Sequence, residues 1–277
     1  MWIAVGNSVN GETGTGTGTG GGRLAPTFLT ESTTGITLYF GVFSDDQSYP
    51  FTVHWGDGSS TEVTSGNSVS HSYSGSAAQY EVSFSGEKVF LYNDDRFGIN
   101  TWIDTVYRFD TLGFGASTFK NLSPTMSGVT TTPGAFNTNG ISQSFSAGTS
   151  SPPAIVLPNN IGDWDVSGVD DFVSVFTNVT PSSLGSQPAS WTFKNNCNLN
   201  SATFLNMTDA NVAACLVGWE SNSNQGTGVI MNNPFNAGFV TGGRTLSQST
   251  YPAAKTAYDN LLSTYSWVDT NAINWVA

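Results

Sequence analysis

The sequence predicts a mainly β protein in which a strand-rich N-terminal region precedes a repeat solenoid with a helical cap. From residue 24 onward, short runs of β-branched and aromatic residues alternate with turns rich in Gly, Ser, Thr and Asn. Residues 161–176, which read IGDWDVSGVDDFVSVF, show the pattern of a strand, a tight turn and a short amphipathic helix. One such unit cannot bury its own apolar face, so further units are expected to stack on both sides of it.

Charge is scarce in this chain. Only 10% of the 277 residues are charged and the net charge is −12, whereas an average soluble protein has about 25% charged residues. An acidic surface opposes contact with nucleic acid, and the eight Lys and Arg are scattered singly. No apolar run approaches the ~20 residues of a membrane span. We therefore expect neither nucleic-acid binding nor membrane insertion.

Residues 1–23 are expected to form an N-terminal anchor and a linker. The first ten residues include the apolar Trp2, Ile3 and Val5, and residues 11–22 are a low-complexity GETGTGTGTGGG sequence. The start lacks the basic region and long apolar stretch of a secretory signal. An apolar peptide on a flexible tether fits a strand that adds to a neighbouring protein or exchanges between copies of this chain. The alternative is that it folds back as an edge strand of the following domain.

The most regular strand pattern lies between residues 24 and 92. Trp55 ends one strand as a large core residue, and Asp57-Gly58 supplies turn chemistry directly after it. The run from Tyr80 alternates apolar and polar side chains, as a half-buried strand does. These features predict a β domain over residues 24–92.

This region resembles the PKD-like family, whose pattern is a strand ending in WGDG, then HxY, then YxVxxxG. The matched positions are Trp55, Gly56, Asp57, Gly58, His71, Tyr73, Tyr80, Val82 and Gly86. The resemblance implies an immunoglobulin-like β-sandwich. We expect structural roles for both histidines, with His54 facing away from Val53 and Trp55, and His71 hydrogen-bonded to the turn.

The unit at residues 161–176 places Val169, Phe172, Val173 and Phe176 on one face of an expected helix. Its WDVSGVDDFVSVF sequence resembles the repeat of BspA-like leucine-rich-like surface proteins. The matched positions are Trp164, Asp165, Val166, Ser167, Val169, Asp171 and Phe176. The resemblance implies an irregular leucine-rich-repeat-like solenoid over residues 93–245, with Phe119, Phe136, Phe145 and Phe204 as remnants of other units.

Two helices are expected near the C-terminus. Asp209 can cap the first, and Ser249 or Thr250 can cap a second that has Pro252 in its first turn. Strand-like segments follow at residues 265–268 and 273–276. We interpret residues 246–277 as a cap that covers the open end of the solenoid.

Candidate chemical sites are few. Calcium could be held by carboxylates of the 161–176 unit, although their spacing is not that of an EF-hand loop. These candidates are Asp163, Asp165, Asp170 and Asp171. Cys197 and Cys215 form no metal-binding motif and are either two separate buried thiols, which we favour, or a disulfide. No nucleophile, zinc or phosphate-loop motif is present, so we expect no enzyme and no cofactor.

The function expected from these features is that of a bacteriophage virion surface protein, either a capsid decoration or a tail-fibre component. Both resemblances point to adhesive or decorative modules. Other virion proteins or copies of this chain would bind the N-terminal segment, and a host glycan or protein could bind the exposed surface. The alternatives are a bacterial cell-surface adhesin and, with less support, a polysaccharide depolymerase.

Overall fold

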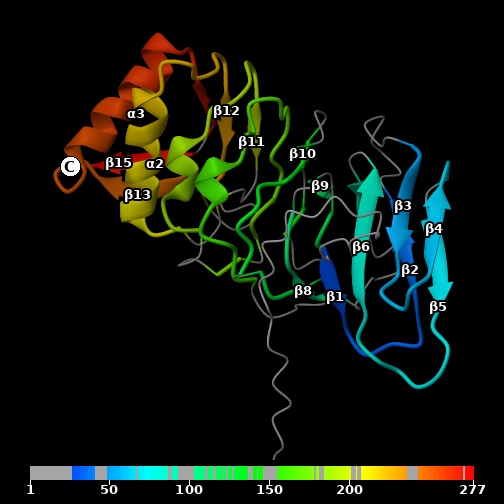
Figure 1. Cartoon of the computed structure of the whole chain (residues 1–277). Helices are drawn as coiled ribbons and strands as arrows, with labels where there is room; N and C mark the ends of the chain where they lie inside the picture. Colours follow the sequence, from blue (N-terminus) through cyan, green and yellow to red (C-terminus); the bar gives the residue numbers. More distant parts are fainter. Residues whose placement is uncertain are drawn as a thin grey trace, which may run out of the picture.

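The computed structural model describes residues 27–40, 49–66, 68–86 and 89–92, then most of 103–145 and 155–277 with short gaps. Strands form most of its regular structure, which confirms the mainly β prediction. Figure 1 shows two regions: antiparallel strands at one end of the molecule, and a stack of parallel strands that leads to two helices at the other end.

The antiparallel region, which we call the β unit, contains two sheets. Its larger sheet has the strand order β4-β3-β6-β1-β8, with β4 at Ser60–Val63, β3 at Phe51–His54, β6 at Glu81–Gly86, β1 at Phe28–Thr30 and β8 at Ile103–Val106. Its smaller sheet pairs β2 (Gly35–Tyr39) with β5 (Ser68–Ser72). All of these pairings are antiparallel.

The two sheets of the β unit pack together through side chains that are buried at every second position of a strand. Phe51, Val53 and Trp55 are buried while the residues between them are half-buried, as expected for a strand with one face on the core. Phe40, at the end of β2, meets Phe51 edge to face with ring centroids 4.9 Å apart. This contact crosses from one sheet to the other and closes the core.

The parallel region, which we call the stack, begins with β7 (Val89–Phe90), β9 (Leu112–Phe114) and β10 (Ala135–Phe136), which form one sheet. A second sheet joins β11 (Asn198–Asn200), β12 (Ile230–Asn232) and β14 (Val268–Asp269). β13 (Arg244–Ser247) pairs with β15 (Ile273–Val276). Single parallel bridges, such as Ile155 with Val179 and Asp171 with Asn198, link segments between these sheets. Parallel pairing of successive segments is how one layer of the chain lies on the next.

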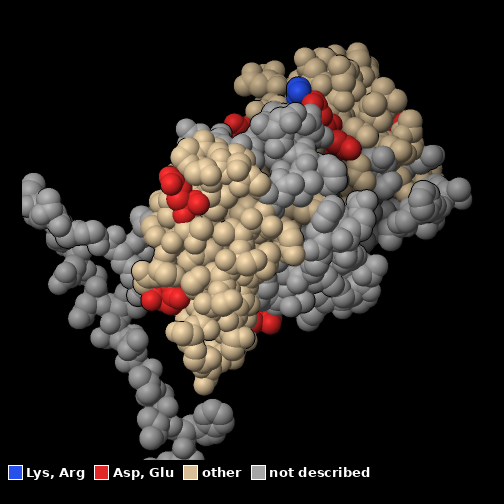
Figure 2. Space-filling view, turned by 90° about the vertical axis from the view of Figure 1, so that its right-hand side faces the viewer, with Lys and Arg blue, Asp and Glu red and all other residues tan. Residues whose placement is uncertain are grey.

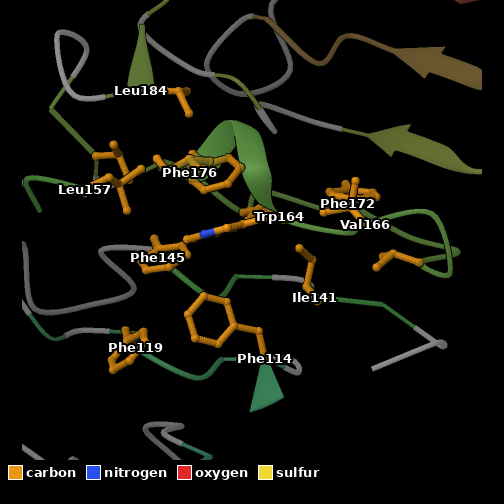
Figure 3. Packing of buried hydrophobic residues seen from close by; sticks show 14 of the residues in the cluster. Phe114, Phe119, Ile141, Phe145, Leu157, Trp164, Val166, Phe172, Phe176 and Leu184 are labelled. Carbon is orange, nitrogen blue, oxygen red and sulfur yellow. The ribbon is translucent and has the colours of Figure 1, made fainter. Parts of the chain in front are cut away.

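A ladder of phenylalanines runs through the core of the stack. The centroid distances of the four successive ring pairs are 5.6, 5.5, 6.3 and 5.9 Å, and the interplanar angles lie between 10° and 27°. The ladder residues are Phe119, Phe145, Phe176, Phe204 and Phe235. Figure 3 shows its first three members with Trp164 and Phe114 packed beside them. One aromatic ring from each layer therefore forms the axis of this core.

The backbone repeats at the same register as the ladder. Ser117, Gln143, Ser174 and Asn233 each lie two residues before a ladder phenylalanine, and each has a positive φ between 54° and 61°. Four non-glycine residues in the left-handed region show that one turn geometry is used again and again. The spacing of the apolar residues alone does not reveal this turn.

The left-handed turn at Ser174 contradicts the prediction of a helix in this segment. No α-helix forms over residues 169–176, because the left-handed conformation of Ser174 interrupts any helical run and Asp171 instead bridges Asn198 of the next layer. Val173 is therefore only half-buried, and Val175 takes the buried place. The expected strand before it also differs, since Ile161–Asp163 form the 3₁₀ turn η1.

Helix α2 (Asp209–Ser221) and helix α3 (Pro252–Thr264) occur where helices were predicted, but their caps differ. Thr208, not Asp209, caps α2 and accepts a hydrogen bond from Asn211 N at 3.2 Å. Tyr251 is the N-cap residue of α3 and gives no side-chain cap. The expected capping hydroxyl of Thr250 bonds Ser247 Oγ instead, at 3.1 Å.

Strand pairing crosses the expected domain boundary at residues 92/93. β7 lies before the boundary yet pairs with β9 of the stack, and β8 lies after it yet pairs with β1 of the β unit. Tyr107 N also donates to Thr27 O at 2.9 Å. The two regions thus share sheet contacts and one continuous apolar core.

Candidate functional site

The turn after β3 brings Asp57 and Ser59 together with His71. Asp57 Oδ1 accepts hydrogen bonds from Ser59 N at 2.9 Å and from Ser59 Oγ at 2.6 Å. Asp57 Oδ2 lies 2.8 Å from His71 Nε2, which comes from β5 of the other sheet. The expected hydrogen bond between His71 and the turn is therefore present.

Aromatic rings form the floor beneath this turn. The His71 ring stacks on Trp55 with centroids 4.9 Å apart and planes 8° from parallel. Trp55 is fully buried and donates from Nε1 to Thr61 Oγ1 at 2.9 Å. The buried Tyr73 hydroxyl donates to Trp55 O at 2.9 Å. His54 is separate from this cluster, since its Nε2 lies 2.9 Å from Ser85 Oγ on β6.

Two glycines allow the turn to form. Gly56 has a φ of +85°, and a Cβ on it would lie 2.6 Å from Glu81 O and 2.8 Å from Glu81 N. No other residue fits so close to the neighbouring backbone. Gly58 has a φ of +93° but open space around it, so glycine is favoured there by the backbone conformation and not by lack of room.

The surroundings of the turn shift the pKa values of Asp57 and Tyr73. Burial alone would raise the pKa of Asp57, but hydrogen bonds from Ser59 and His71 outweigh it and lower the pKa to about 2. Burial, with the nearby charge of Asp57, raises the pKa of Tyr73. Asp57 is thus an anion throughout the neutral range and Tyr73 a neutral donor.

A serine, a histidine and an aspartate meet here, but not as a catalytic relay. In a relay the aspartate orients one imidazole nitrogen while the other takes the serine proton. Here a single nitrogen, His71 Nε2, faces Asp57 at 2.8 Å and Ser59 Oγ at 3.5 Å. The Ser59 hydroxyl donates to Asp57 instead, which leaves it unactivated. The arrangement locks a turn between two sheets.

The carboxylates considered for calcium do not converge. Across the described residues, no group of three or more His, Cys, Asp or Glu side chains is placed to hold a metal ion. Asp165 accepts from Ser167 N at 3.1 Å and from Ser167 Oγ at 2.6 Å, and these hydrogen bonds lower its pKa. Asp163 is exposed in η1.

Asp170 and Asp171 take structural positions beside β11. Asp170 Oδ1 pairs with Lys194 Nζ at 2.7 Å, and burial raises the pKa of Asp171. Most of the other matched residues of this unit are buried in the core, namely Trp164, Val166, Val169 and Phe176, whereas Ser167 is exposed at the turn. This segment therefore works as one layer of the stack.

Both cysteines are free and buried, which confirms the prediction of two separate thiols. Burial raises the pKa of Cys197 to about 12, helped by the neighbouring Asp171 and Asp170. Burial alone raises the pKa of Cys215. A thiol that stays protonated is a poor nucleophile, so neither residue is poised for chemistry.

A hollow of about 500 Å³ lies where the chain enters α3 beside α2. Its walls are mainly small or apolar and include Ala213, Val217, Gly218, Tyr251, Pro252 and Ala253. Sequence reasoning missed this hollow, since it depends on how two helices approach each other. The only available signal was the cluster of small residues at 213–214 and 253–254.

The proposed anchor residues Trp2, Ile3 and Val5 lie outside the described residues. No described helix has the length and apolar character that crossing a membrane requires. Comparison of the chain with protein-family models, with curated proteins and with solved structures finds no match.

Proposed function

We propose that this protein is a non-enzymatic structural protein of a bacteriophage virion surface, either a capsid decoration or a tail-fibre component, with an adhesive role toward the host surface. The observation that carries the proposal is the way the β unit runs into the stack. Exchange of β7 and β8 and a shared core join them into one body. A single joined body of this kind suits a protein that projects from the surface of a particle and keeps its shape there.

The finer fold assignment belongs to the same proposal. We assign the β unit to the PKD-like, immunoglobulin-like sandwiches, on the strength of the WGDG turn and its contacts with His71 and Tyr73. We assign the stack to irregular leucine-rich-repeat-like solenoids of the BspA-like type, on the strength of its parallel bridges and phenylalanine ladder. The segment after residue 246 would close the last layer.

The exterior supports a role in display. Figure 2 shows a face of the β unit on which charged side chains are sparse and scattered. Turns of the stack expose neutral amides, as at Asn195 and Asn196, and hydroxyls, as at Ser167. Asn195 Oδ1 also accepts from Thr227 N of the next layer at 2.9 Å, which fixes the turn. Rigid amides and hydroxyls match the hydrogen-bonding groups of a glycan.

Immunogold labelling of purified, intact particles tests this function. Antibodies raised against the whole chain should place gold on the outside of each particle, at the head or along the tail. Particles from a phage that lacks the gene serve as the control for specificity. Absence of label from intact particles rules the proposal out. Label on uninfected cells would instead support the bacterial cell-surface adhesin.

A further inference from the structure

The hollow between α2 and α3 is an apolar surface that the chain leaves uncovered. Val217 projects from α2 at its edge and is 39% exposed, which makes it one of the few large apolar side chains exposed in the described part of the chain. None of the residues that line the hollow carries a charge. Leaving such a surface in water forgoes the free energy of burying it.

At Gly218, which lines the hollow, α2 also packs closely against a neighbouring segment. A Cβ on Gly218 would lie 2.7 Å from Ala189 Cβ, and the Ala189 carbonyl oxygen is closer still. Ala189 belongs to η2 (Gln187–Ser190), so α2 is drawn toward η2. Ala213 of α2 and Ala253 of α3 also line the hollow, and their small side chains do not fill the space between the two helices.

We propose that this hollow receives residues 1–10 of a second copy of the chain. Those residues contain no charged side chain, and Trp2, Ile3 and Val5 are large and apolar. A volume of about 500 Å³ is within the range of about 300–1,000 Å³ for sites that bury small ligands. It accommodates one or two large side chains and is too small for a folded face. The proposal rests on the proposed function, because it names the site that the N-terminal anchor would occupy.

The arrangement in space favours a second copy over the same one. The first described strand, β1, lies in the sheet of the β unit, whereas α2 and α3, whose residues line the hollow, lie at the other end of the molecule (Figure 1). The residues between position 10 and position 27 have a root-mean-square end-to-end distance of roughly 20–25 Å if they behave as a flexible coil. The proposed contact joins the N-terminal segment of one copy to the hollow between α2 and α3 of another. Because the two surfaces differ, the contact is heterologous and produces rings or open filaments.

Mass photometry of the full chain over a range of concentrations tests the proposal. The unchanged protein should form concentration-dependent oligomers, because the contact joins two copies. Trp2→Ala removes the largest inserted side chain, and Val217→Asp puts a carboxylate into the hollow. Each should weaken association at least about tenfold, since burial of an unpaired charge or loss of an apolar anchor is costly.

Val276→Asp is the matched control. Val276 is 42% exposed on β15 and does not line the hollow, so this variant should associate as the unchanged protein does. A synthetic peptide of residues 1–10 should bind the Trp2→Ala chain and fail to bind the chain that carries both Trp2→Ala and Val217→Asp. Thermal melting checks that each variant is folded.

The proposal is overturned if the unchanged protein stays monomeric at every concentration, or if Val217→Asp and Val276→Asp behave alike. Monomers in which Trp2→Ala alters the environment of the hollow would mean that the segment binds its own copy. The function itself is tested separately, because gold on the particle surface does not depend on how copies join.

Discussion

Asp57 and His71 connect the two sheets of the β unit through a hydrogen bond of 2.8 Å between Asp57 Oδ2 and His71 Nε2. The Asp57 side chain is 27% exposed, so solvent weakens the charge attraction and the hydrogen bonds give most of the benefit. The pKa of Asp57 in the folded protein is about 2, below the ordinary value of 3.8. Its contribution to stability is therefore complete above pH 4 and is lost as the pH falls toward 2.

Asp57→Asn tests this contribution. At pH 7 we expect the variant to lose about 1 kcal/mol of unfolding free energy, the typical worth of a hydrogen bond. The difference from the unchanged protein should shrink as the pH is lowered from 4 to 2, because Asp57 of the unchanged protein then becomes protonated. Thermal unfolding at pH 7, 4 and 2.5 measures it. A deficit that stays constant down to pH 2 would contradict the assigned pKa.

Trp164 and Trp191 stack on each other with centroids 6.5 Å apart, yet they differ in one interaction. Trp191 Nε1 donates to Ile161 O at 2.8 Å, whereas Trp164 Nε1 is buried and has no hydrogen-bond partner among the described residues. Trp191→Phe should therefore cost about 1 kcal/mol more than Trp164→Phe. Urea unfolding of both variants gives the comparison, and equal costs would argue against the hydrogen bond.

The sequence predicts local structure most reliably where a particular backbone geometry requires a particular type of residue. The WGDG turn can be recognised in the sequence because glycine allows a positive φ, aspartate accepts the hydrogen bonds of the turn and tryptophan fills the core. The structure places Asp57 beside His71 as expected. The turn at Ser174 was not recognisable, because a serine with positive φ has no distinctive sequence signal. A helix was predicted there, since the apolar spacing fits both a helix and a layer of the stack.

Helix α2 is positioned by close contact with η2. Trp219 Nε1 donates to Pro188 O at 2.7 Å, and Gly218 lies against Ala189, so α2 is held close to η2. The same pattern recurs one layer on, where Trp267 Nε1 donates to Gly226 O at 2.8 Å. Indole-to-carbonyl bonds between layers thus accompany the ring stacking.

Gly218→Ala tests the closeness of this contact. Alanine normally stabilises a helix relative to glycine by about 1 kcal/mol. Here we expect a loss of roughly 1–3 kcal/mol, because the added methyl group overlaps Ala189. Gly168→Ala is the control, since no atom lies within 4 Å of a Cβ there, and it should change stability by less than about 0.5 kcal/mol. Stabilisation by Gly218→Ala would show that α2 and η2 are farther apart.

At the scale of the whole molecule, the boundary at residues 92/93 cuts through shared structure. A fragment of residues 24–92 lacks β8 beside β1, and it also lacks Gly113, against whose backbone the Phe90 ring is packed. A fragment of residues 24–114 retains both contacts. We expect the longer fragment to melt at a clearly higher temperature. Equal melting temperatures would mean that the β unit folds without its neighbours.

We propose that this body projects from the surface of a virion. Cryo-electron microscopy of intact particles, compared with particles that lack the gene, tests it most directly. We expect a protrusion that is present only in complete particles, into which the β unit and the stack fit as one rigid piece. Identical surface density in the two kinds of particle would contradict it.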